Sequence, residues 1–75
     1  MFETLKKFLV EELHVNPDEV TMTAELSGDL GINSLELADL VFVCEEKFNI
    51  EISDDDLHNF VTVGDVVRYL EERTK

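Results

Sequence analysis

The sequence is poor in cysteine, in basic residues and in long apolar runs, and each shortage excludes a class of protein. Its one cysteine, Cys44, cannot form an internal disulfide, so nothing in the chain calls for an oxidising compartment. No apolar run approaches the roughly 20 residues that span a membrane. Lys6, Lys7 and Glu11 interrupt the apolar residues of the segment MFETLKKFLVEEL, which is unlike the core of a signal peptide. We therefore expect a cytoplasmic protein.

The shortage of basic residues also indicates the kind of partner. Six Lys and Arg stand against 18 Asp and Glu, which gives a formal net charge of −12. No Lys or Arg lies between Phe8 and Glu46. Such a field repels nucleic acid and anionic membranes and steers the molecule toward basic protein surfaces. We expect neither nucleic acid nor a membrane as a partner.

The length bounds the domain organisation. At 75 residues the chain is expected to form a single domain over residues 1–75 and to act as a monomer. A domain of this size buries only about 60% of the surface that its unfolded chain exposes, which leaves little room for a deep active-site cleft. The 44% hydrophobic content is still enough for a core.

Hydrophobic spacing predicts the first helix and a long loop after it. Apolar residues at helical intervals predict an amphipathic helix from about Glu3 to His14, with its apolar face formed by Phe2, Leu5, Phe8, Leu9 and Leu13. Asn16 and Pro17 then favour a turn or a single helical turn. Residues 15 to 32 have no sustained period and predict a loop, and a loop this long in a small domain is often functional.

The second predicted helix, from Ser34 to about Phe48, carries two stripes. One is the natural core face: Leu37, Leu40, Val41, Cys44 and Phe48. The other mixes carboxylates with apolar side chains: Leu35, Ala38, Asp39, Phe42, Glu45 and Glu46.

Two more helices complete the prediction. Ser53 followed by Asp54, Asp55 and Asp56 indicates a short helix ending near Asn59. Thr62 and Asp65 resemble a capping box that starts a last helix. That helix has a buried stripe of Val63, Val66, Val67 and Leu70, and Arg73 and Lys75 suit its C-terminal end. No segment alternates as a strand does, so the fold is predicted to be an all-α bundle of three principal helices and one short helix.

The start of the second helix holds two polar residues where one would suffice. With Asn33 as the N-cap, Glu36 becomes the third helical residue and can reach back to the N–H of the cap. The hydroxyl of Ser34 would then face solvent beside free backbone N–H groups, a place that suits an attached phosphate diester. Many helices begin with two polar residues, however, and the motif alone leaves open that Ser34 is itself the cap.

The segment LGINSLELADLVFVCEEKFNIEISDDDLHNFVTVGDVVRYLEE resembles the acyl carrier proteins, whose pattern is Leu-Gly, a variable residue, Asp-Ser-Leu, and then an acidic and apolar helix. The likeness extends back through LKKFLVEELHVNPDEVT and the long loop. The resemblance implies that Ser34 carries 4'-phosphopantetheine through a phosphodiester, attached by a carrier-protein synthase (a phosphopantetheinyl transferase). It also implies that the thiol of the arm holds acyl groups as thioesters, and that the protein itself is not an enzyme.

One residue departs from the family pattern. Asn33 stands where the family usually has Asp, which preserves capping but removes a charge. We expect this change to weaken modification moderately, because a synthase that pairs a basic residue with the Asp loses that contact.

The resemblance also assigns roles to the two stripes of the second helix. Residues of the mixed stripe match the surface that docks on basic patches of partner enzymes in similar carrier proteins: Leu35, Glu36, Ala38, Asp39, Phe42, Glu45 and Glu46. In this fold the core can open to hold an acyl chain, and the expected lining is Leu37, Val41, Cys44, Val61 and Tyr69. Each of these five is equally explained as ordinary core, and Cys44 as a small hydrophobic residue.

The expected function is that of an acyl carrier in fatty acid biosynthesis, acting with enzymes that have basic docking patches. A specialised carrier for polyketide or aminoacyl groups is the near alternative. An unmodified acidic interaction module is the alternative from another class. We expect no metal, because SDDDLHNF lacks the spaced oxygen ligands and turn Gly of an EF-hand loop, and His14 and His58 have no ligand partners at useful spacing.

Overall fold

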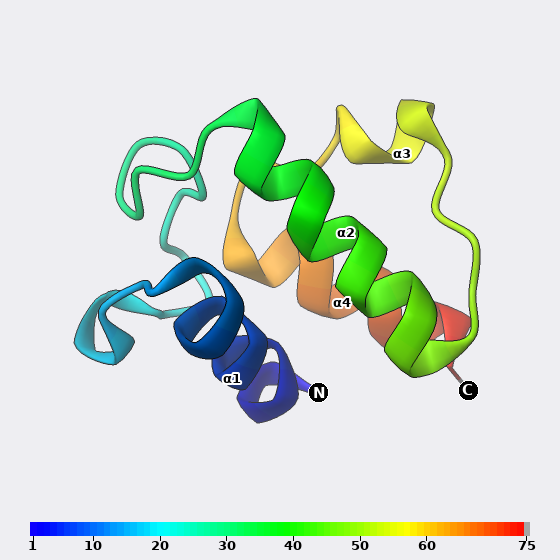
Figure 1. Ribbon diagram of the computed structural model, residues 1–75, viewed down its shortest axis with the longest axis horizontal. Coiled ribbons are helices and arrows are strands. Elements are labelled where there is room, and N and C mark those ends of the chain that lie inside the picture. Colours follow the sequence, from blue (N-terminus) through cyan, green and yellow to red (C-terminus); the bar gives the residue numbers. More distant parts are fainter. Residues whose placement is uncertain (75) are drawn as a thin grey trace.

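Four α-helices and one 3₁₀ turn form the regular structure in the computed structural model, which describes residues 1–74 (Figure 1). The predicted all-α bundle, with three principal helices and one short one, is confirmed. The elements are α1 (Phe2–Leu13), η1 (Pro17–Glu19), α2 (Ser34–Phe48), α3 (Asp54–Leu57) and α4 (Val63–Arg73). Lys75, which was expected at the end of the last helix, lies outside the described residues.

Two helix ends differ from the prediction. The first helix ends at Leu13 because His14 adopts a left-handed conformation (φ 57°), in which His14 N bonds to the carbonyl of Val10 (3.1 Å) and Val15 N bonds to that of Leu9 (3.2 Å). The third helix ends at Leu57 rather than near Asn59. The N–H of Asn59 bonds instead to the carbonyl of Asp56 (3.0 Å), so the chain continues as a tighter turn.

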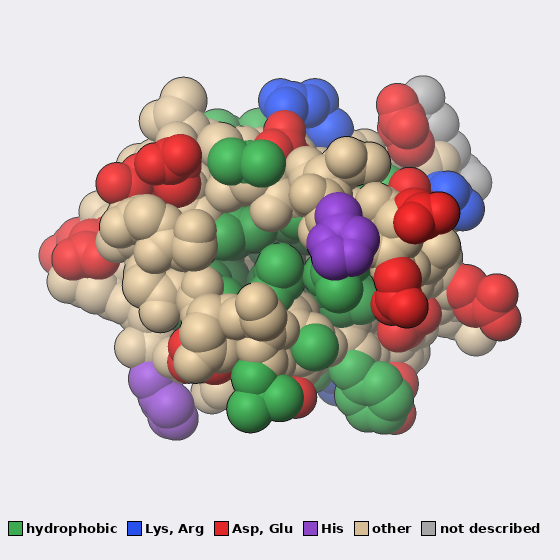
Figure 2. All heavy atoms as spheres, turned by 90° about the horizontal axis from the view of Figure 1, so that it is seen from above, with side chains coloured by type: hydrophobic (Ala, Val, Ile, Leu, Met, Phe, Trp, Pro, Cys, Tyr) green, Lys and Arg blue, Asp and Glu red, His purple; other side chains and the backbone are tan. Residues whose placement is uncertain are grey.

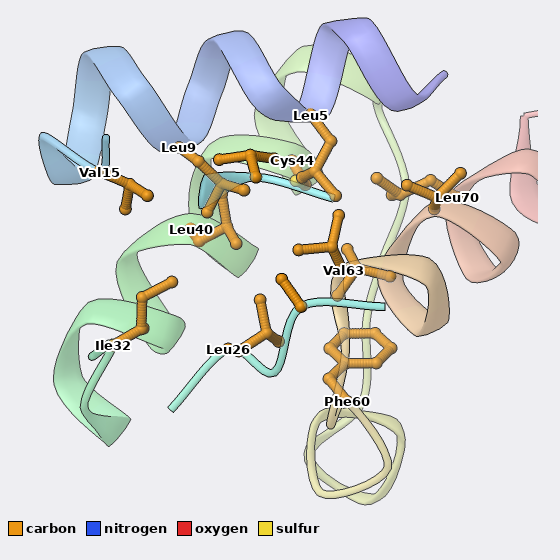
Figure 3. Packing of buried hydrophobic residues seen from close by; sticks show 14 of the residues in the cluster. Leu5, Leu9, Val15, Leu26, Ile32, Leu40, Cys44, Phe60, Val63 and Leu70 are labelled. Carbon is orange, nitrogen blue, oxygen red and sulfur yellow. The ribbon is translucent and has the colours of Figure 1, made fainter. Parts of the chain in front are cut away.

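The core lies between α1, α2 and α4, and α1 packs against both of the other two helices (Figures 1 and 3). Leu5 and Leu9 of α1 are fully buried, and they point toward side chains of α2 and α4. The predicted stripe of α4 is confirmed, because all four of its residues are buried: Val63, Val66, Val67 and Leu70. On α2 the middle of the predicted core stripe is buried, whereas its two ends, Leu37 and Phe48, are half-buried. Among residues 1–74, no helix combines the length and the apolar character needed to cross a bilayer.

The long loop, residues 14–33, contributes to the core although it lacks a helical period. Its buried side chains are Val15, Val20, Ala24, Leu26 and Ile32. Backbone hydrogen bonds tie the loop to the start of α4, from Leu26 N to Val61 O (2.9 Å) and from Val63 N to Ala24 O (3.0 Å). A third bond runs from Gly64 N to Met22 O (2.8 Å). The loop is therefore anchored at the point where α4 begins.

The capping box predicted for the last helix is present. Asp65 N donates to Thr62 Oγ1 (3.2 Å), and Thr62 N donates back to Asp65 Oδ2 (3.0 Å). The same carboxylate oxygen accepts from Val61 N (3.1 Å), and the other pairs with Arg68 (2.7 Å). The bond from Thr62 N–H is the main cause that lowers the pKa of Asp65, helped by the Val61 N–H and the Arg68 charge.

Replacement of Gly64 tests the contact between loop and helix. In an open helix Gly→Ala stabilises by up to about 1 kcal/mol. A Cβ at Gly64 would lie 2.8 Å from the carbonyl oxygen of Met22, so we expect Gly64→Ala to lower the free energy of unfolding, by roughly 1–3 kcal/mol. Urea denaturation measures the free energy of unfolding. Gly28→Ala is the control, because its Cβ would come within 2.9 Å only of the flexible Glu25 carboxylate. A Gly64→Ala protein as stable as the wild type would contradict the expectation.

Candidate functional site

A complete capping box fixes the start of α2. Glu36 N donates to Asn33 Oδ1 (2.8 Å), and Asn33 N donates to Glu36 Oε1 (3.2 Å). Asn33 has extended backbone angles (φ −85°, ψ 176°), as an N-cap requires. The structure thus decides the alternative that the motif left open: Asn33 is the cap, and Ser34 is the first residue of the helix.

Ser34 is exposed at the positive end of a 15-residue helix. Of the amides in the first turn, Glu36 N is bonded to the cap side chain and Leu37 N to the carbonyl of Asn33 (2.9 Å). Within residues 1–74 the N–H groups of Ser34 and Leu35 have no partner. The hydroxyl is therefore accessible and lies next to two backbone donors that can bind an anion.

The other two serines offer a different environment. Ser53 Oγ accepts from Asp56 N (3.2 Å), so this hydroxyl is used as the cap of α3, a helix of only four residues. Ser27 is exposed within the long loop and begins no helix. Ser34 alone combines an exposed hydroxyl with the first position of a long helix.

A half-open hollow of about 310 Å³ lies beside Ser34. Figure 2 shows hydrophobic side chains gathered at the floor of a hollow on this face. Its walls come from the loop, the start of α2, the end of α3 and the link to α4: Leu26, Ser27, Ile32, Asn33, Ser34, Leu37, Leu57, His58, Phe60 and Val61. The volume falls at the lower end of the range for ligand pockets.

The hollow brings together two of the five residues expected to line an acyl pocket. Leu37 and Val61 lie in its wall. Val41 and Cys44 are buried in the core and do not line it, and Tyr69 packs elsewhere, with its hydroxyl donating to Asp56 (2.8 Å). The loop and α3 also supply walls of this hollow, and nothing in the sequence signals them because these residues belong to no periodic stripe.

The mixed stripe of α2 is only partly free. Leu35 and Phe42 are 74% and 60% exposed, and Ala38, Asp39 and Glu46 are also exposed. Two predicted docking carboxylates are engaged within the protein. Glu36 belongs to the capping box, and Glu45 Oε2 accepts from Ile52 N (2.9 Å). The free surface, called here the outer face of α2, consists of Leu35, Ala38, Asp39, Phe42 and Glu46.

Comparison with known proteins identifies the family. A family model described as a phosphopantetheine attachment site matches residues 3–70. An acyl carrier protein of Wolinella succinogenes is 49% identical, over 95% of this chain and 93% of the relative. An acyl carrier protein of Clostridium perfringens is 44% identical, over 100% of this chain and 99% of the relative. One of Helicobacter pylori is also 44% identical, over 96% of this chain and 92% of the relative. This chain belongs to the acyl carrier protein family. Its members are carriers and not catalysts, so the protein is not an enzyme.

The residues at the start of α2 fit the covalent group of the acyl carrier protein family, 4'-phosphopantetheine. An ester needs an accessible hydroxyl, and Ser34 is exposed. The phosphate of the group needs hydrogen-bond donors, and two backbone N–H groups lie at the same place. The hollow next to Ser34 offers apolar walls to the part of an arm that lies closest to the protein.

Cys44, inside this acyl carrier fold, has none of the features of a reactive thiol. It is 1% exposed, and burial, with the Glu45 charge as a second cause, raises its pKa to about 12. The thiolate is the nucleophilic form of cysteine, so the side chain stays an inert part of the core at neutral pH.

The acidic segment around α3 is held by side chains of α4. Asp56 Oδ2 accepts from the Tyr69 hydroxyl (2.8 Å) and lies 3.6 Å from the Arg73 guanidinium, which also covers the Tyr69 ring at 4.8 Å. Across residues 1–74, no three His, Cys, Asp or Glu side chains are grouped as a metal site would require.

Proposed function

We propose that this acyl carrier protein bears 4'-phosphopantetheine on Ser34 and carries acyl groups as thioesters on the thiol of the arm, in fatty acid biosynthesis. The observation that carries the proposal is the exposed hydroxyl of Ser34 at the first position of α2, with Asn33 rather than Ser34 acting as the cap. In this proposal residues 1–75 act as one carrier domain.

The chain supplies the acceptor for the attachment step. The Ser34 oxygen forms the new bond to phosphorus, while the bond from that phosphorus to the bridging oxygen of the coenzyme A pyrophosphate breaks. Adenosine 3',5'-bisphosphate leaves, and the hydroxyl proton passes to a base of the synthase. The N–H groups of Ser34 and Leu35 then face the negative charge of the phosphodiester, which the positive end of the helix also stabilises.

The outer face of α2 is the proposed docking surface for the synthase and for enzymes of fatty acid biosynthesis with basic patches. Asp39 and Glu46 steer the approach of a basic partner, because complementary charge raises association rates. Leu35 and Phe42 provide apolar anchors within the same surface. A small surface of this kind favours weak and reversible contact, which a carrier needs in order to move between enzymes.

Intact-mass spectrometry after incubation with coenzyme A and a carrier-protein synthase tests the attachment site. The wild type should gain one phosphopantetheinyl unit and Ser34→Ala none, because no other serine heads a long helix. Ser53→Ala is the control and should gain the unit at the wild-type rate. A mass gain that persists in Ser34→Ala would contradict the site. No gain in the wild type with several competent synthases would favour an unmodified acidic interaction module.

Replacement of the cap residue tests the expected effect of Asn33. Asn33→Asp keeps a capping oxygen and restores a negative charge next to Ser34, so stability should change little. The initial rate of phosphopantetheine transfer should rise by roughly fivefold, which corresponds to about 1 kcal/mol for one exposed ion pair with the synthase. Asn49→Asp makes the same change at the other end of α2 and should not raise the rate. The expectation fails if Asn33→Asp is modified no faster than the wild type.

Charge removal tests the docking surface. The double variant Asp39→Asn, Glu46→Gln removes two charges from the outer face of α2. We expect it to lower kcat/KM of the synthase for this carrier about tenfold at low salt, and to weaken the dependence of kcat/KM on salt. Glu11→Gln, Glu12→Gln removes the same charge from exposed positions of α1. If this control lowered kcat/KM equally, overall charge rather than the outer face would govern docking.

A further inference from the structure

Among residues 1–74, His58 is the one residue lining the hollow that can become positively charged. No Lys, Arg, Asp or Glu of this described part of the chain lies in its wall, and its polar residues other than His58 are Ser27, Asn33 and Ser34. His58 belongs to the wall of the hollow whose hydrophobic side chains are visible in Figure 2. In the sequence, His58 has no ligand partner at useful spacing. The fold nevertheless brings it to the same hollow as the hydroxyl of Ser34, the proposed attachment site.

The backbone of His58 is held firmly while its side chain stays exposed. His58 N bonds to Asp54 O (3.2 Å), and the preceding residue, Leu57, is half-buried in the same wall. Asp56 anchors α3 to α4 through the Tyr69 hydroxyl (2.8 Å). The backbone thus places an exposed imidazole at the hollow.

The acidic residues next to His58 in the chain do not line the hollow. On its own element, the acidic residues are Asp54, Asp55 and Asp56, of which Asp56 is engaged with Tyr69 and Arg73. From the loop and the 60–61 link no charged side chain lines the hollow. The carboxylate in the first turn of α2, Glu36, is held in the capping box. Of the residues that the structure describes, His58 is the one cationic side chain that an anion at Ser34 would meet in the hollow.

We infer that His58 is a positioning residue for the phosphopantetheine arm: its protonated imidazole pairs with the phosphodiester on Ser34 and holds the start of the arm against the hollow. This inference rests on the proposed attachment at Ser34. A phosphodiester keeps a single negative charge throughout the range in which histidine titrates, between about pH 5 and 8. The pair requires the protonated imidazole and is lost when the imidazole gives up its proton.

Phosphorus-31 NMR of the modified protein tests the pair. Because the phosphodiester does not itself titrate between about pH 5 and 8, a sigmoidal change of its chemical shift reports a neighbouring group that does. We expect such a step in the wild type, a smaller step at high salt, and no step in His58→Gln. His14→Gln removes the other histidine, which lies at the end of α1, and should keep the step.

The outcomes separate this inference from the proposed function. Intact mass is measured first on each protein. If the arm is attached but the wild-type signal is flat with pH, or if His58→Gln keeps the step, His58 does not position the arm while attachment at Ser34 stands. If the wild type gains no arm, the proposed function fails and this inference fails with it.

Discussion

The capping box between Asn33 and Glu36 is the interaction on which the site depends. A helix has one N-cap, and its side chain satisfies donors that would otherwise be unpaired. Because Asn33 takes that position, the hydroxyl of Ser34 has no capping duty and stays exposed. The same arrangement leaves two backbone N–H groups for a negatively charged ligand. If the helix began one residue later, Ser34 would be the cap and its hydroxyl would no longer be free.

The rest of the fold holds this helix start in place. The loop of residues 14–33 is tied to the first turn of α4 through the bond between Gly64 and Met22, and Ile32 N bonds back to Leu26 O (2.9 Å) just before the cap. Gly31 adopts a left-handed conformation (φ 68°), which glycine allows without strain, and leads the chain into Ile32. The side chain of Ile32 is buried, so the residue before Asn33 is anchored in the core. These contacts also form the hollow next to Ser34.

Features set by local chemistry could be predicted from the sequence. The bounds of α2 and the capping boxes at Asn33 and Thr62 depend on residues three positions apart, and the buried stripe of α4 follows the helical period. The end of α1 was misplaced, because nothing in the sequence signals that His14 adopts a left-handed conformation. Contacts between residues of different segments could not be predicted from the sequence either. The bond from Ile52 N to Glu45 and the approach of His58 to the hollow exist only once the chain has folded.

The two faces of α2 divide the work of a carrier. Its inner face joins the core through Leu40 and Cys44, and its outer face presents Phe42 among carboxylates. In the proposed function, the packed inner face keeps the helix start in place while the outer face is free to meet partner enzymes. Within that proposal the chain needs no catalytic group, since the reactive thiol would belong to the attached arm.

Amide hydrogen exchange across residues 33–37 of the unmodified protein tests the central claim most directly. If Asn33 is the cap, the amides of Glu36 and Leu37, which are hydrogen-bonded, should exchange clearly more slowly than those of Ser34 and Leu35, which are free. Protection at Ser34 or Leu35, or exchange of Glu36 as fast as theirs, would contradict it, because the helix would then begin elsewhere.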